Sequence, residues 1–419
     1  MANKMSNNTK KSQYDLVIVG GGMVGASLAC ALGTQPLRIA MVEAVPYQAE
    51  SQPSYDDRAI ALSFGTHTIF NGIGVWPHLA EHATAIKHIH VSEQGAFGAT
   101  RLHHSDEGVP ALGYVVTARH IGQALISRLQ TLKNVEVISP AQLSDLHHNE
   151  EFVSITVRKD NQSLVLESQL LIAADGGQST TRQLLGISAT KTDYRQSAII
   201  ANVSTQQPHG NVAFERFTPD GPLAVLPMSA AGDNHRCAVV WTQRGDKVEA
   251  IAALDEPDFL QQLQRSFGNR LGRFLKAGKR SVYPLYLMHV QEQVRPRVAL
   301  IGNAAHTLHP IAGQGFNLGL RDVAALAEII VNAQQAQADI GDLGVLQQYA
   351  QWRKTDHKQI IGFTDSLVRL FSNRFAPLHS ARTAGLLALD TLPPVKHVLA
   401  KHTMGLAGKL PRLARGLSL

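Results

Sequence analysis

The sequence predicts an α/β protein built around a Rossmann-like dinucleotide-binding unit at residues 15–43. The apolar run from Leu16 to Val19 leads directly into a glycine-rich turn, which is typical of a buried parallel strand. An alanine-rich helix through Leu32 and a second apolar strand ending in Glu43 complete a βαβ unit. With 419 residues, 44% hydrophobic and 17% charged, the chain is long enough for two or three globular domains.

The turn is Gly20-Gly21-Gly22-Met23-Val24-Gly25. Gly20 permits the tight bend, Gly22 lets backbone approach a pyrophosphate, and Gly25 allows close packing of the helix on the strand. The helix N-terminus offers free N–H groups to the phosphates. Glu43 follows Gly25 by 18 residues, where a carboxylate accepts hydrogen bonds from ribose hydroxyls and repels a 2′-phosphate. The turn by itself predicts a dinucleotide and does not separate FAD from NAD.

Two later segments repeat the arrangement of a strand followed by a polar turn. The strand Leu170 to Ala174 precedes Asp175-Gly176, and the strand Val298 to Ile301 precedes Gly302-Asn303. A loop rich in proline and glycine then leads to a helix that we expect to begin at about Asn317. We therefore expect one cofactor site assembled from three separated stretches of chain.

These three segments resemble, in order and spacing, the glycine-rich, DG and GD motifs of class A flavoprotein aromatic hydroxylases. The resemblance implies a three-layer ββα FAD-binding domain of the p-hydroxybenzoate-hydroxylase type, with an inserted, mostly β substrate domain and a helical C-terminal segment. It also implies that Asp175 orients the chain near the pyrophosphate. Asn303 stands where the family has Asp, and it can still accept the hydrogen bond from a ribityl hydroxyl of FAD.

The family's PxxGQGxN loop is matched by Pro310, Gly313, Gln314, Gly315, Phe316 and Asn317. Here a positive helix end beside the flavin N1–C2=O edge would stabilise the reduced ring, and Gly313, Gln314 and Gly315 would shape the ring site. Arg58 and Arg119 match family positions near the flavin. The alternative for each arginine is a surface salt bridge.

The resemblance divides the chain into six stretches. The FAD-binding domain is expected from 14–75, 105–187 and 291–345, the substrate domain from 76–104 and 188–290, and the helical C-terminal segment from 346–419.

Residues 213–228 and 277–285 narrow the resemblance to the hydroxylases of ubiquinone biosynthesis, and most closely to those acting on 2-polyprenyl-6-methoxyphenol. It implies that NAD(P)H, bound transiently, reduces FAD, and that O₂ then forms a flavin C4a-hydroperoxide that hydroxylates the polyprenyl phenol to a benzoquinol. The apolar run Pro222, Leu223, Ala224, Val225 and Leu226 is expected to line the substrate pocket. No catalytic residue is assigned, because the flavin carries the chemistry; a structural hydrogen bond is the expected role of both His306 and His309.

Four alternatives remain open. The enzyme could hydroxylate another ring position of the same pathway, or the chain could be a non-catalytic, GDI-type prenyl-binding protein of the same fold. A prenyl-chain reductase would use reduced FAD without O₂. A flavin halogenase would carry a WxWxIP motif, whereas Trp76, Trp241 and Trp352 are scattered.

No metal site is expected. His78 and His82 frame an HxxEH pattern that some metalloproteases use, but among 19 histidines such a match arises easily and no third ligand is apparent. The two cysteines, Cys30 and Cys237, lie far apart and form no CxxC motif. A disulfide framework and a thiolate zinc site are therefore disfavoured.

The net charge of +6 is concentrated near the C-terminus, where residues 383–419 carry five Lys or Arg against one Asp. We expect either a solvated tail or a contact with an anionic surface, through a short basic amphipathic helix at 410–419. An interface in a homo-oligomer or in a complex with other pathway enzymes is the alternative. Nucleic acid is not an expected partner. The chain shows no apolar signal sequence and no spanning segment, so a cytoplasmic protein, peripheral on the inner face of the membrane, is expected.

Overall fold

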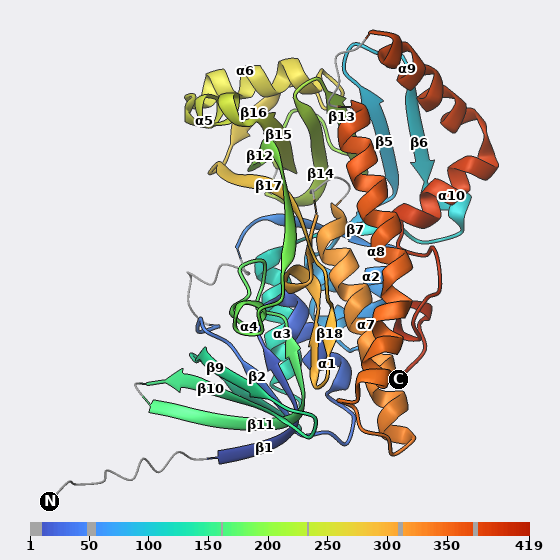
Figure 1. Cartoon of the computed structure of the whole chain (residues 1–419). Helices are drawn as coiled ribbons and strands as arrows, with labels where there is room; N and C mark the ends of the chain where they lie inside the picture. Colours follow the sequence, from blue (N-terminus) through green and yellow to red (C-terminus); the bar gives the residue numbers. More distant parts are fainter. Residues whose placement is uncertain (1–10, 48–55, 161, 233, 309–312, 372–375) are drawn as a thin grey trace, which may run out of the picture.

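The computed structural model describes residues 11–47, 56–160, 162–232, 234–308, 313–371 and 376–419. Figure 1 shows two halves, each built around its own large sheet, with long helices running along one side of both. The chain passes between the halves several times, because strands from the middle of the sequence extend from one half into the other.

The first sheet contains the predicted dinucleotide-binding strands in the order β18-β19-β11-β1-β2-β8. The pairs β11–β19, β1–β11, β1–β2 and β2–β8 are all parallel. Leu16 and Ile18 of β1 pack into one hydrophobic core, and Val17 and Val19 pack into another. Burial on both faces explains why this strand reads as a continuous apolar run. The bounds are β1 Lys11–Val19, β2 Ile39–Val42, β8 Val135–Ile138, β11 Gln162–Ala173, β18 Val294–Arg295 and β19 Val298–Leu300.

Helices cover one face of this sheet, and an antiparallel meander covers the other. Residues of α1 (Met23–Leu32), α3 (Ala118–Leu129) and α7 (Gln314–Gln335) share one core with the sheet. The meander consists of β9 (Gln142–His148), β10 (Val153–Lys159) and the first part of β11, and it packs on the second core. This is the three-layer ββα arrangement that the sequence predicted.

The second sheet has the order β20-β17-β12-β15-β14-β13-β5-β6, and β16 pairs with β12. Helices α5 (Gly245–Ala253) and α6 (Glu256–Phe267) pack on its outer face through a core that includes Trp241 and Phe259. The sheet is the inserted, mostly β part of the chain. Its strands are β5 His88–Glu93, β6 Ala99–His103, β12 Ala189–Thr205, β13 Val212–Thr218, β14 Gly221–Ala231, β15 Asn234–Arg244, β16 Phe274–Ala277, β17 Ser281–Val290 and β20 His306–Thr307.

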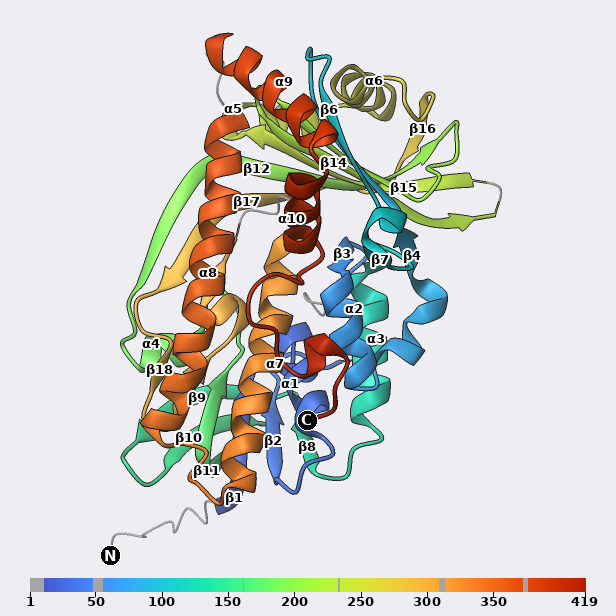
Figure 2. The same cartoon turned by 90° about the vertical axis from the view of Figure 1, so that its right-hand side faces the viewer.

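A small third sheet lies where the two halves meet (Figure 2). It has the order β3-β7-β4, with β3 at Ala59–Ser63, β7 at Gly113–Thr117 and β4 at Thr84–Ile86. Ser63 caps the following helix α2 (Phe64–Gly72), because its side chain accepts a hydrogen bond from the amide of Thr66.

The last quarter of the chain, from Gln314 onward, is mostly helical in its described residues, as expected. After α7 come α8 (Leu343–Phe371), α9 (Ala376–Thr391) and α10 (Pro393–Thr403). Helix α8 extends along both halves, and α9 and α10 lie against the β5–β6 end of the second sheet (Figures 1 and 2). None of the helices in the described residues combines the length and apolar character needed to cross a bilayer.

The end of the chain differs from the expected amphipathic helix. Only Leu413–Arg415 forms a helical turn, a 3-10 helix, and Leu413 and Ala414 are buried in the core beside α2. The amide of Arg412 donates to Glu328 of α7, and the backbone oxygen of Lys409 accepts from the indole of Trp352. Leu413 and Ala414 therefore pack on the protein itself, and the expected amphipathic helix at 410–419 does not form.

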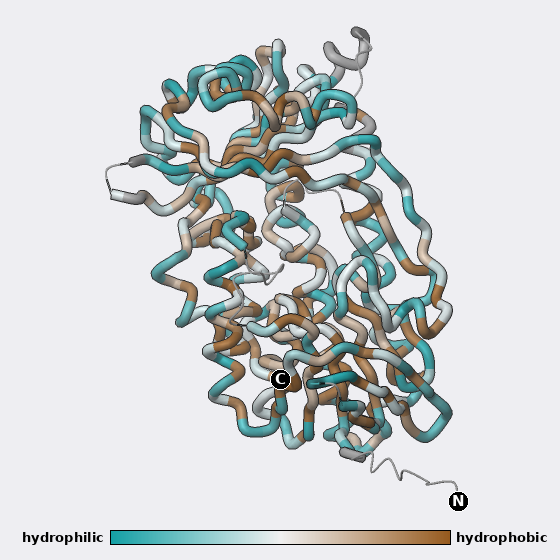
Figure 3. The backbone as a smooth tube through the Cα atoms, turned by 90° about the vertical axis from the view of Figure 1, so that its left-hand side faces the viewer, coloured by the Kyte–Doolittle hydropathy of each residue, from teal (hydrophilic) through white to brown (hydrophobic). Residues whose placement is uncertain are grey.

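The observed starts of α7 and β1 differ by a few residues from those predicted from the sequence. Helix α7 begins at Gln314 rather than at Asn317, since Gly313 adopts a left-handed conformation (φ +63°) directly before it. Strand β1 begins at Lys11, because its first residues pair with β11 beyond the apolar run. In Figure 3 the hydrophobic segments gather inside both halves, where the hydrophobic cores of the two large sheets lie. The expected division into six stretches of two domains and a tail stays a prediction.

Candidate active site

A cavity of about 830 Å³ lies between the two halves. One end is lined by the glycine-rich turn, the other by the inner face of the second sheet and by helices α8, α9 and α10. Strand β3 and the start of α7 line the cavity as well. The cavity thus connects the predicted cofactor segments to an apolar wall from the inserted sheet.

The glycine-rich turn has no room for side chains. Gly20 has φ +103°, and a Cβ there would lie 2.5 Å from the backbone oxygen of Ala174. A Cβ on Gly25 would lie 1.9 Å from the backbone oxygen of Gly20. Gly22 caps helix α1 and, with Met23 and Val24, lines the cavity. The turn therefore presents a helix N-terminus and bare backbone to the cavity, as a pyrophosphate requires.

Glu43 closes the end of β2, as predicted, and is buried. Its carboxylate accepts hydrogen bonds from the amides of Gly21 at 2.7 Å and Val45 at 2.8 Å. Tyr47, which no motif marked, donates its hydroxyl to the backbone oxygen of Gly21 at 3.1 Å. Glu43 and Tyr47 together hold the glycine-rich turn from outside the cavity lining.

Asp175 lies at the turn after β11 and is absent from the described cavity wall. Its carboxylate accepts hydrogen bonds from the Ser179 hydroxyl at 2.5 Å and from the Thr181 amide and hydroxyl, both at 2.9 Å. These contacts shape the start of α4 (Thr180–Leu184). The neighbouring Gly176 (φ +83°) lines the cavity, and a Cβ there would meet nothing within 4 Å. Asp175 thus orders the loop that presents Gly176.

Asn317 ties the start of α7 to the small third sheet. Its Nδ2 donates to the backbone oxygens of Ala61 at 2.9 Å and Gly313 at 2.8 Å. Its Oδ1 accepts from the amide of Ser63 at 2.9 Å and the hydroxyl of Thr66 at 2.7 Å. All four hydrogen-bonding positions of the amide are used. The predicted site residue Asn317 therefore connects the loop to both β3 and α2.

The other predicted residues divide into two groups. Gly313, Gly315, Phe316, Asn303 and Arg58 line the cavity, whereas Gln314 is buried beside it and Arg119 is not part of its wall. Arg58 forms an ion pair with Asp56, and the exposed Arg119 forms one with Asp57 at 2.8 Å. Pro310 and His309 lie outside the described residues.

The described residues fit an FAD molecule. Gly22, Gly176 and Gly315 all expose backbone to the cavity, and a Cβ on Gly315 would meet nothing within 4 Å. Helices α1 and α7 both begin at the cavity, so two positive helix ends point toward it. Bare backbone suits a flat ring, and a helix N-terminus suits a phosphate or an anionic ring edge.

Along strand β14 of the inserted sheet, only alternate side chains face the cavity. Ala224 and Leu226 of β14 line the cavity, whereas Leu223 and Val225 face the core beneath α5 and α6. Pro222 is not part of the described cavity wall. The sequence treated 222–226 as one lining run, but successive side chains of a strand point to opposite faces, so only alternate residues reach the cavity.

Three charged side chains line the described cavity: Arg58, Arg382 and Glu215. Arg58 is paired with Asp56, and Arg382 donates to Glu93 at 2.8 Å. Burial raises the pKa of Glu215 to about 7. No motif marked Glu215, although it is the one acidic residue in the apolar stretch AFERF of β13.

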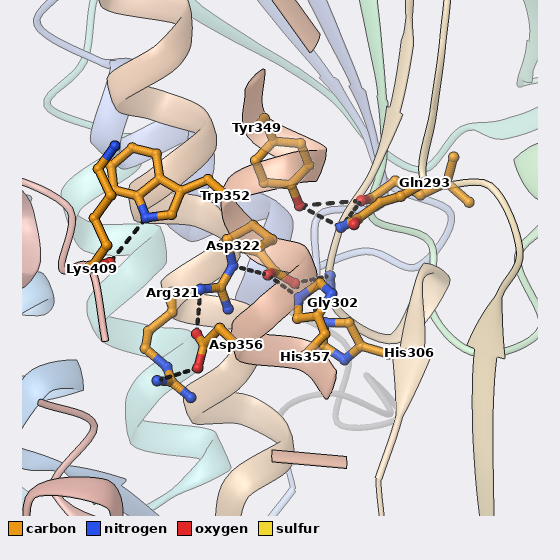
Figure 4. Close-up of polar contacts among 12 residues, drawn as sticks. Gln293, Gly302, His306, Arg321, Asp322, Tyr349, Trp352, Asp356, His357 and Lys409 are labelled. Carbon is orange, nitrogen blue, oxygen red and sulfur yellow. Dashed lines mark hydrogen bonds and ion pairs between the residues drawn. The ribbon is translucent and has the colours of Figure 1, made fainter. Parts of the chain in front are cut away.

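Behind the cavity, a buried network surrounds Asp322 of α7 (Figure 4). Its carboxylate accepts hydrogen bonds from His306 at 2.6 Å, His357 at 2.7 Å and Arg353 at 2.7 Å. Burial alone would raise the pKa of Asp322, but the two histidines and Arg353 hold it well below its usual range. Arg353 also pairs with Asp356, and these two carboxylates raise the pKa of its guanidinium against the effect of burial.

The network joins β20, which precedes the loop before α7, to the two helices α7 and α8, which follow it. His306 belongs to β20, Asp322 to α7 and His357 to α8. Among the described residues, His306, Asp322 and His357 are the cluster whose ligand atoms lie close enough for a metal ion, within 4.8 Å of one another. The guanidinium of Arg353 on the same carboxylate repels a cation, so we interpret the cluster as a structural ion-pair network.

The HxxEH pattern does not form a helical metal motif. His78 and His82 lie on two successive 3-10 helices, Trp76–His78 and Ala80–His82. The ring of His82 stacks on His120, with 3.9 Å between ring centroids. The two histidines therefore do not share one α-helical face, as the pattern requires.

The sequence is similar to a known protein family and to named hydroxylases. Residues 13–364 match the family described as FAD binding domain. The chain is 37% identical to the ubiquinone hydroxylase UbiL of Rhodospirillum rubrum, over 97% of this chain and 93% of that protein. It is 32% identical to the 3-demethoxyubiquinol 3-hydroxylase of Escherichia coli, over 94% of this chain and 98% of the relative.

The fold is also similar to that of solved monooxygenases. The crystal structure of the p-nitrophenol 4-monooxygenase PnpA from Pseudomonas putida superposes with a TM-score of 0.78 at 18% identity. The alignment covers 96% of this chain and all of that one. This similarity extends over both halves and the helical C-terminal segment.

Proposed function

Since this chain belongs to the FAD binding domain family, as an FAD-dependent monooxygenase of the ubiquinone-hydroxylase branch, we propose that it hydroxylates 2-polyprenyl-6-methoxyphenol to the benzoquinol. NAD(P)H would be the reductant and O₂ the source of the oxygen atom. The observation that supports this most directly is the continuity of the cavity, from the glycine-rich turn to the apolar wall of the second sheet.

The proposed cofactor contacts follow the cavity. Gly22, Met23 and Val24 would hold the pyrophosphate, and Glu43 would stabilise their turn and approach the ribose. Gly313, Gly315 and Asn317 would support the flavin ring, with Asn303 at the ribityl chain and Asp175 ordering the loop beside it. When bound, FAD supplies the activation of O₂ and the transfer of one oxygen atom.

The protein's own part is to orient the ring and exclude water. The wall residues Ala224 and Leu226, with Ile86 and Ile89 from the neighbouring strands, form an apolar surface for a methoxylated ring. Leu386, Leu389 and Leu399 of helices α9 and α10 continue this surface toward the outside. A long prenyl chain would therefore leave the ring site along these helices.

The same two helices support a contact with a bilayer surface. Leu387 of α9, Val395 and Val398 of α10 and the intervening Leu392 are exposed, with Val398 at 56%. Other residues of the two helices line the cavity. A polyprenyl substrate partitions into lipid, so an apolar surface at the cavity entrance would give it a direct route. This surface replaces the C-terminal tail as the proposed membrane contact.

The hydroxylase function can be tested with purified holoenzyme and a short-chain 2-prenyl-6-methoxyphenol. The phenol should accelerate NAD(P)H oxidation and yield a quinol that carries one oxygen from ¹⁸O₂. A label that arrives from water would contradict the proposal. Stimulated NAD(P)H oxidation without any hydroxylated product would contradict it as well.

A second ring position is favoured by one relative. The Escherichia coli protein is named for 3-hydroxylation of a demethoxyubiquinol, so the same cavity could serve that position. Offering both phenols in competition, and analysing the products by mass spectrometry, distinguishes the two. In cells that lack the gene, the accumulated precursor should be the preferred substrate.

The membrane contact has its own test. Val398→Asp places a charge on the exposed face of α10, and Leu275→Asp does the same at a 48%-exposed position of β16 in the second sheet. Co-sedimentation with liposomes of neutral and anionic lipids should fall for Val398→Asp and stay at the wild-type level for Leu275→Asp. Equal sedimentation of the two variants would show that this surface of α9 and α10 does not contact the bilayer.

A further inference from the structure

Glu215 is an acidic residue in an otherwise apolar row of the cavity wall. In the register of the second sheet, Val91, Glu215, Ala224, Val240 and Ile200 are successive neighbours on strands β5, β13, β14, β15 and β12. All five line the cavity. Residues paired in register share a face of the sheet, so the carboxyl of Glu215 stands among aliphatic side chains and points into the cavity.

The carboxyl lacks a partner within the described part of the chain. No hydrogen bond or ion pair of a described residue reaches this half-buried side chain, although carboxyls withdrawn from bulk water ordinarily have one. The other cavity charges, Arg58 and Arg382, are engaged by Asp56 and Glu93. A carboxyl that is unsatisfied, desolvated and open to a ligand cavity is the arrangement that a polar group of the ligand would complete.

The charged side chains closest to Glu215 in sequence, and those on the helices packed over the cavity wall, point away from it or are paired with other residues. His90 and Arg216 are paired in register with Phe214 and Leu223, and so lie on the outer face of the sheet beneath α6. On the helices that pack over the wall, Asp365 of α8 accepts from Tyr194, and Asp390 of α9 pairs with Arg101. Burial is accordingly the cause that raises the pKa of Glu215 to about 7.

The wall around Glu215 reaches the proposed flavin loop. A Cβ on Gly313 would lie 3.1 Å from the Cβ of Ala61, so these two residues nearly touch. Ala61 belongs to the same apolar cluster as Ala213 and Leu226. Glu215 follows Ala213 by two residues, on the same face and about 7 Å along the strand. An aromatic ring lying over Ala213 could therefore meet the flavin loop at one edge and Glu215 at another.

We propose that Glu215 binds the phenolic hydroxyl of the substrate and accepts its proton during hydroxylation, which makes it a catalytic residue of this site. The inference rests on the proposed function. The O–H bond of the phenol breaks, its proton moves to a carboxylate oxygen of Glu215, and the electron pair left behind raises the electron density of the ring. The oxygen atom that joins the ring would come from O₂, with the bound FAD, reduced by NAD(P)H, supplying the two electrons; the O–O bond breaks and the second oxygen atom leaves as water. The proton then returns from Glu215 to the ring oxygen as the hydroxylated carbon releases its hydrogen to water as a proton.

A raised pKa suits this role. A general base works best when its pKa lies near the working pH, because it is then both deprotonated and basic enough to accept a proton. Near pH 7 an exposed glutamate would be ionised but a much weaker base. The apolar row thus tunes the carboxyl while it holds the methoxylated ring.

The experiment compares wild type, Glu215→Gln and the control Glu249→Gln as holoenzymes. Gln keeps the size and the hydrogen-bonding capacity of Glu but cannot take the proton, and Glu249 is an exposed residue of α5 on the other side of the sheet. FAD content and the flavin spectrum verify that each variant is folded. Product formation from a short-chain 2-prenyl-6-methoxyphenol is then measured between pH 5.5 and 9.

Glu215→Gln should lower the turnover number for product roughly 100-fold, the size expected when a general base is removed. It should also abolish the inflection near neutral pH that wild type and Glu249→Gln retain. In anaerobic titrations without NAD(P)H, followed by flavin fluorescence, the affinity of wild type for the phenol should change across this pH range, and that of Glu215→Gln should stay constant.

Two results distinguish a failure of the proposed function from a failure of the role assigned to Glu215. If wild type forms no hydroxylated product from any phenol, the proposed function fails. If wild type is active and Glu215→Gln keeps both its rate and its pH profiles, the assignment of Glu215 is overturned and the function stands. Glu215→Asp, which retains a carboxylate one methylene shorter, should recover part of the rate and the inflection.

Discussion

The Nε2 of His306 lies 2.6 Å from the carboxylate of Asp322, and both side chains are almost completely buried. The hydrogen bond joins strand β20, at the end of the segment that begins with Gly302 and Asn303, to helix α7, which starts at the cofactor loop. Figure 4 shows Asp322 between His306 and His357, and Arg353 donates to the same carboxylate at 2.7 Å. The residues on both sides of the loop are thus held by one carboxylate.

Asp322→Asn should unfold the protein more easily and weaken its hold on FAD. The substitution removes one of the two carboxylate charges that offset the buried guanidinium of Arg353 and leaves only that of Asp356. Removing one partner of a buried ion pair typically costs about 3–5 kcal/mol. Thermal unfolding and the FAD content of purified protein measure the two effects. Asp246→Asn, at an exposed position of α5, is the matched control and should change neither. An unchanged melting temperature for Asp322→Asn would contradict the network.

Gly25→Ala should abolish FAD binding. Its Cβ would lie 1.9 Å from the backbone oxygen of Gly20, so α1 and the turn would have to separate. Gly362→Ala in α8 is the matched control, because its Cβ would meet nothing within 4 Å, and alanine stabilises a helix interior by roughly 0.5–1 kcal/mol. Absorbance of bound flavin and thermal unfolding provide the comparison. Stoichiometric FAD in Gly25→Ala would refute the assigned geometry of the turn.

Asn317→Ala should destabilise the loop at residues 313–317 and so weaken FAD binding. The change removes four hydrogen bonds and leaves buried groups such as the Ser63 amide unsatisfied, each at a cost of about 1–3 kcal/mol. We expect FAD to dissociate at least about tenfold more readily, which corresponds to about 1.4 kcal/mol. Fluorescence of released flavin measures this, with the exposed Asn332→Ala of the same helix as control. Equal affinities in both variants would show that Asn317 does not hold the loop.

The stability of the protein should depend on pH through Glu215. Its folded pKa of about 7 lies above the ordinary value of 4.5, so the folded state binds the proton more tightly than the unfolded state. Stability from this group is present below pH 4.5 and is lost as the pH rises to about 7. Between pH 4.5 and 8, Glu215→Gln should therefore gain on the order of 2 kcal/mol in unfolding free energy relative to wild type, after allowance for the half-buried side chain.

Denaturant titrations of both holoenzymes at several pH values measure this difference. A constant offset between them across the pH range would mean that Glu215 titrates as an ordinary carboxyl. Glu249→Gln, exposed on the other side of the sheet, should follow wild type at every pH.

Features that depend on local geometry could be predicted from the amino-acid sequence. Gly20 and Gly25 stand where backbone approaches backbone too closely for any Cβ, and a parallel strand buried on both faces must be apolar throughout, so the βαβ unit could be recognised residue by residue. The loop at 313–317 was identified instead by its resemblance to the family's PxxGQGxN motif, and its helix begins at Gln314 and not at the expected Asn317.

Which residues meet across the cavity became evident only from the folded structure. The run 222–226 looked uniformly apolar, and the pairing of β13, β14 and β15 was needed to separate Ala224 from Leu223 and to reveal Glu215 in the same row. Burial of Leu413 and Ala414 likewise depends on α2, which lies more than 300 residues earlier in the chain. Such contacts are set by sheet register and by the docking of distant elements, and no local pattern encodes either.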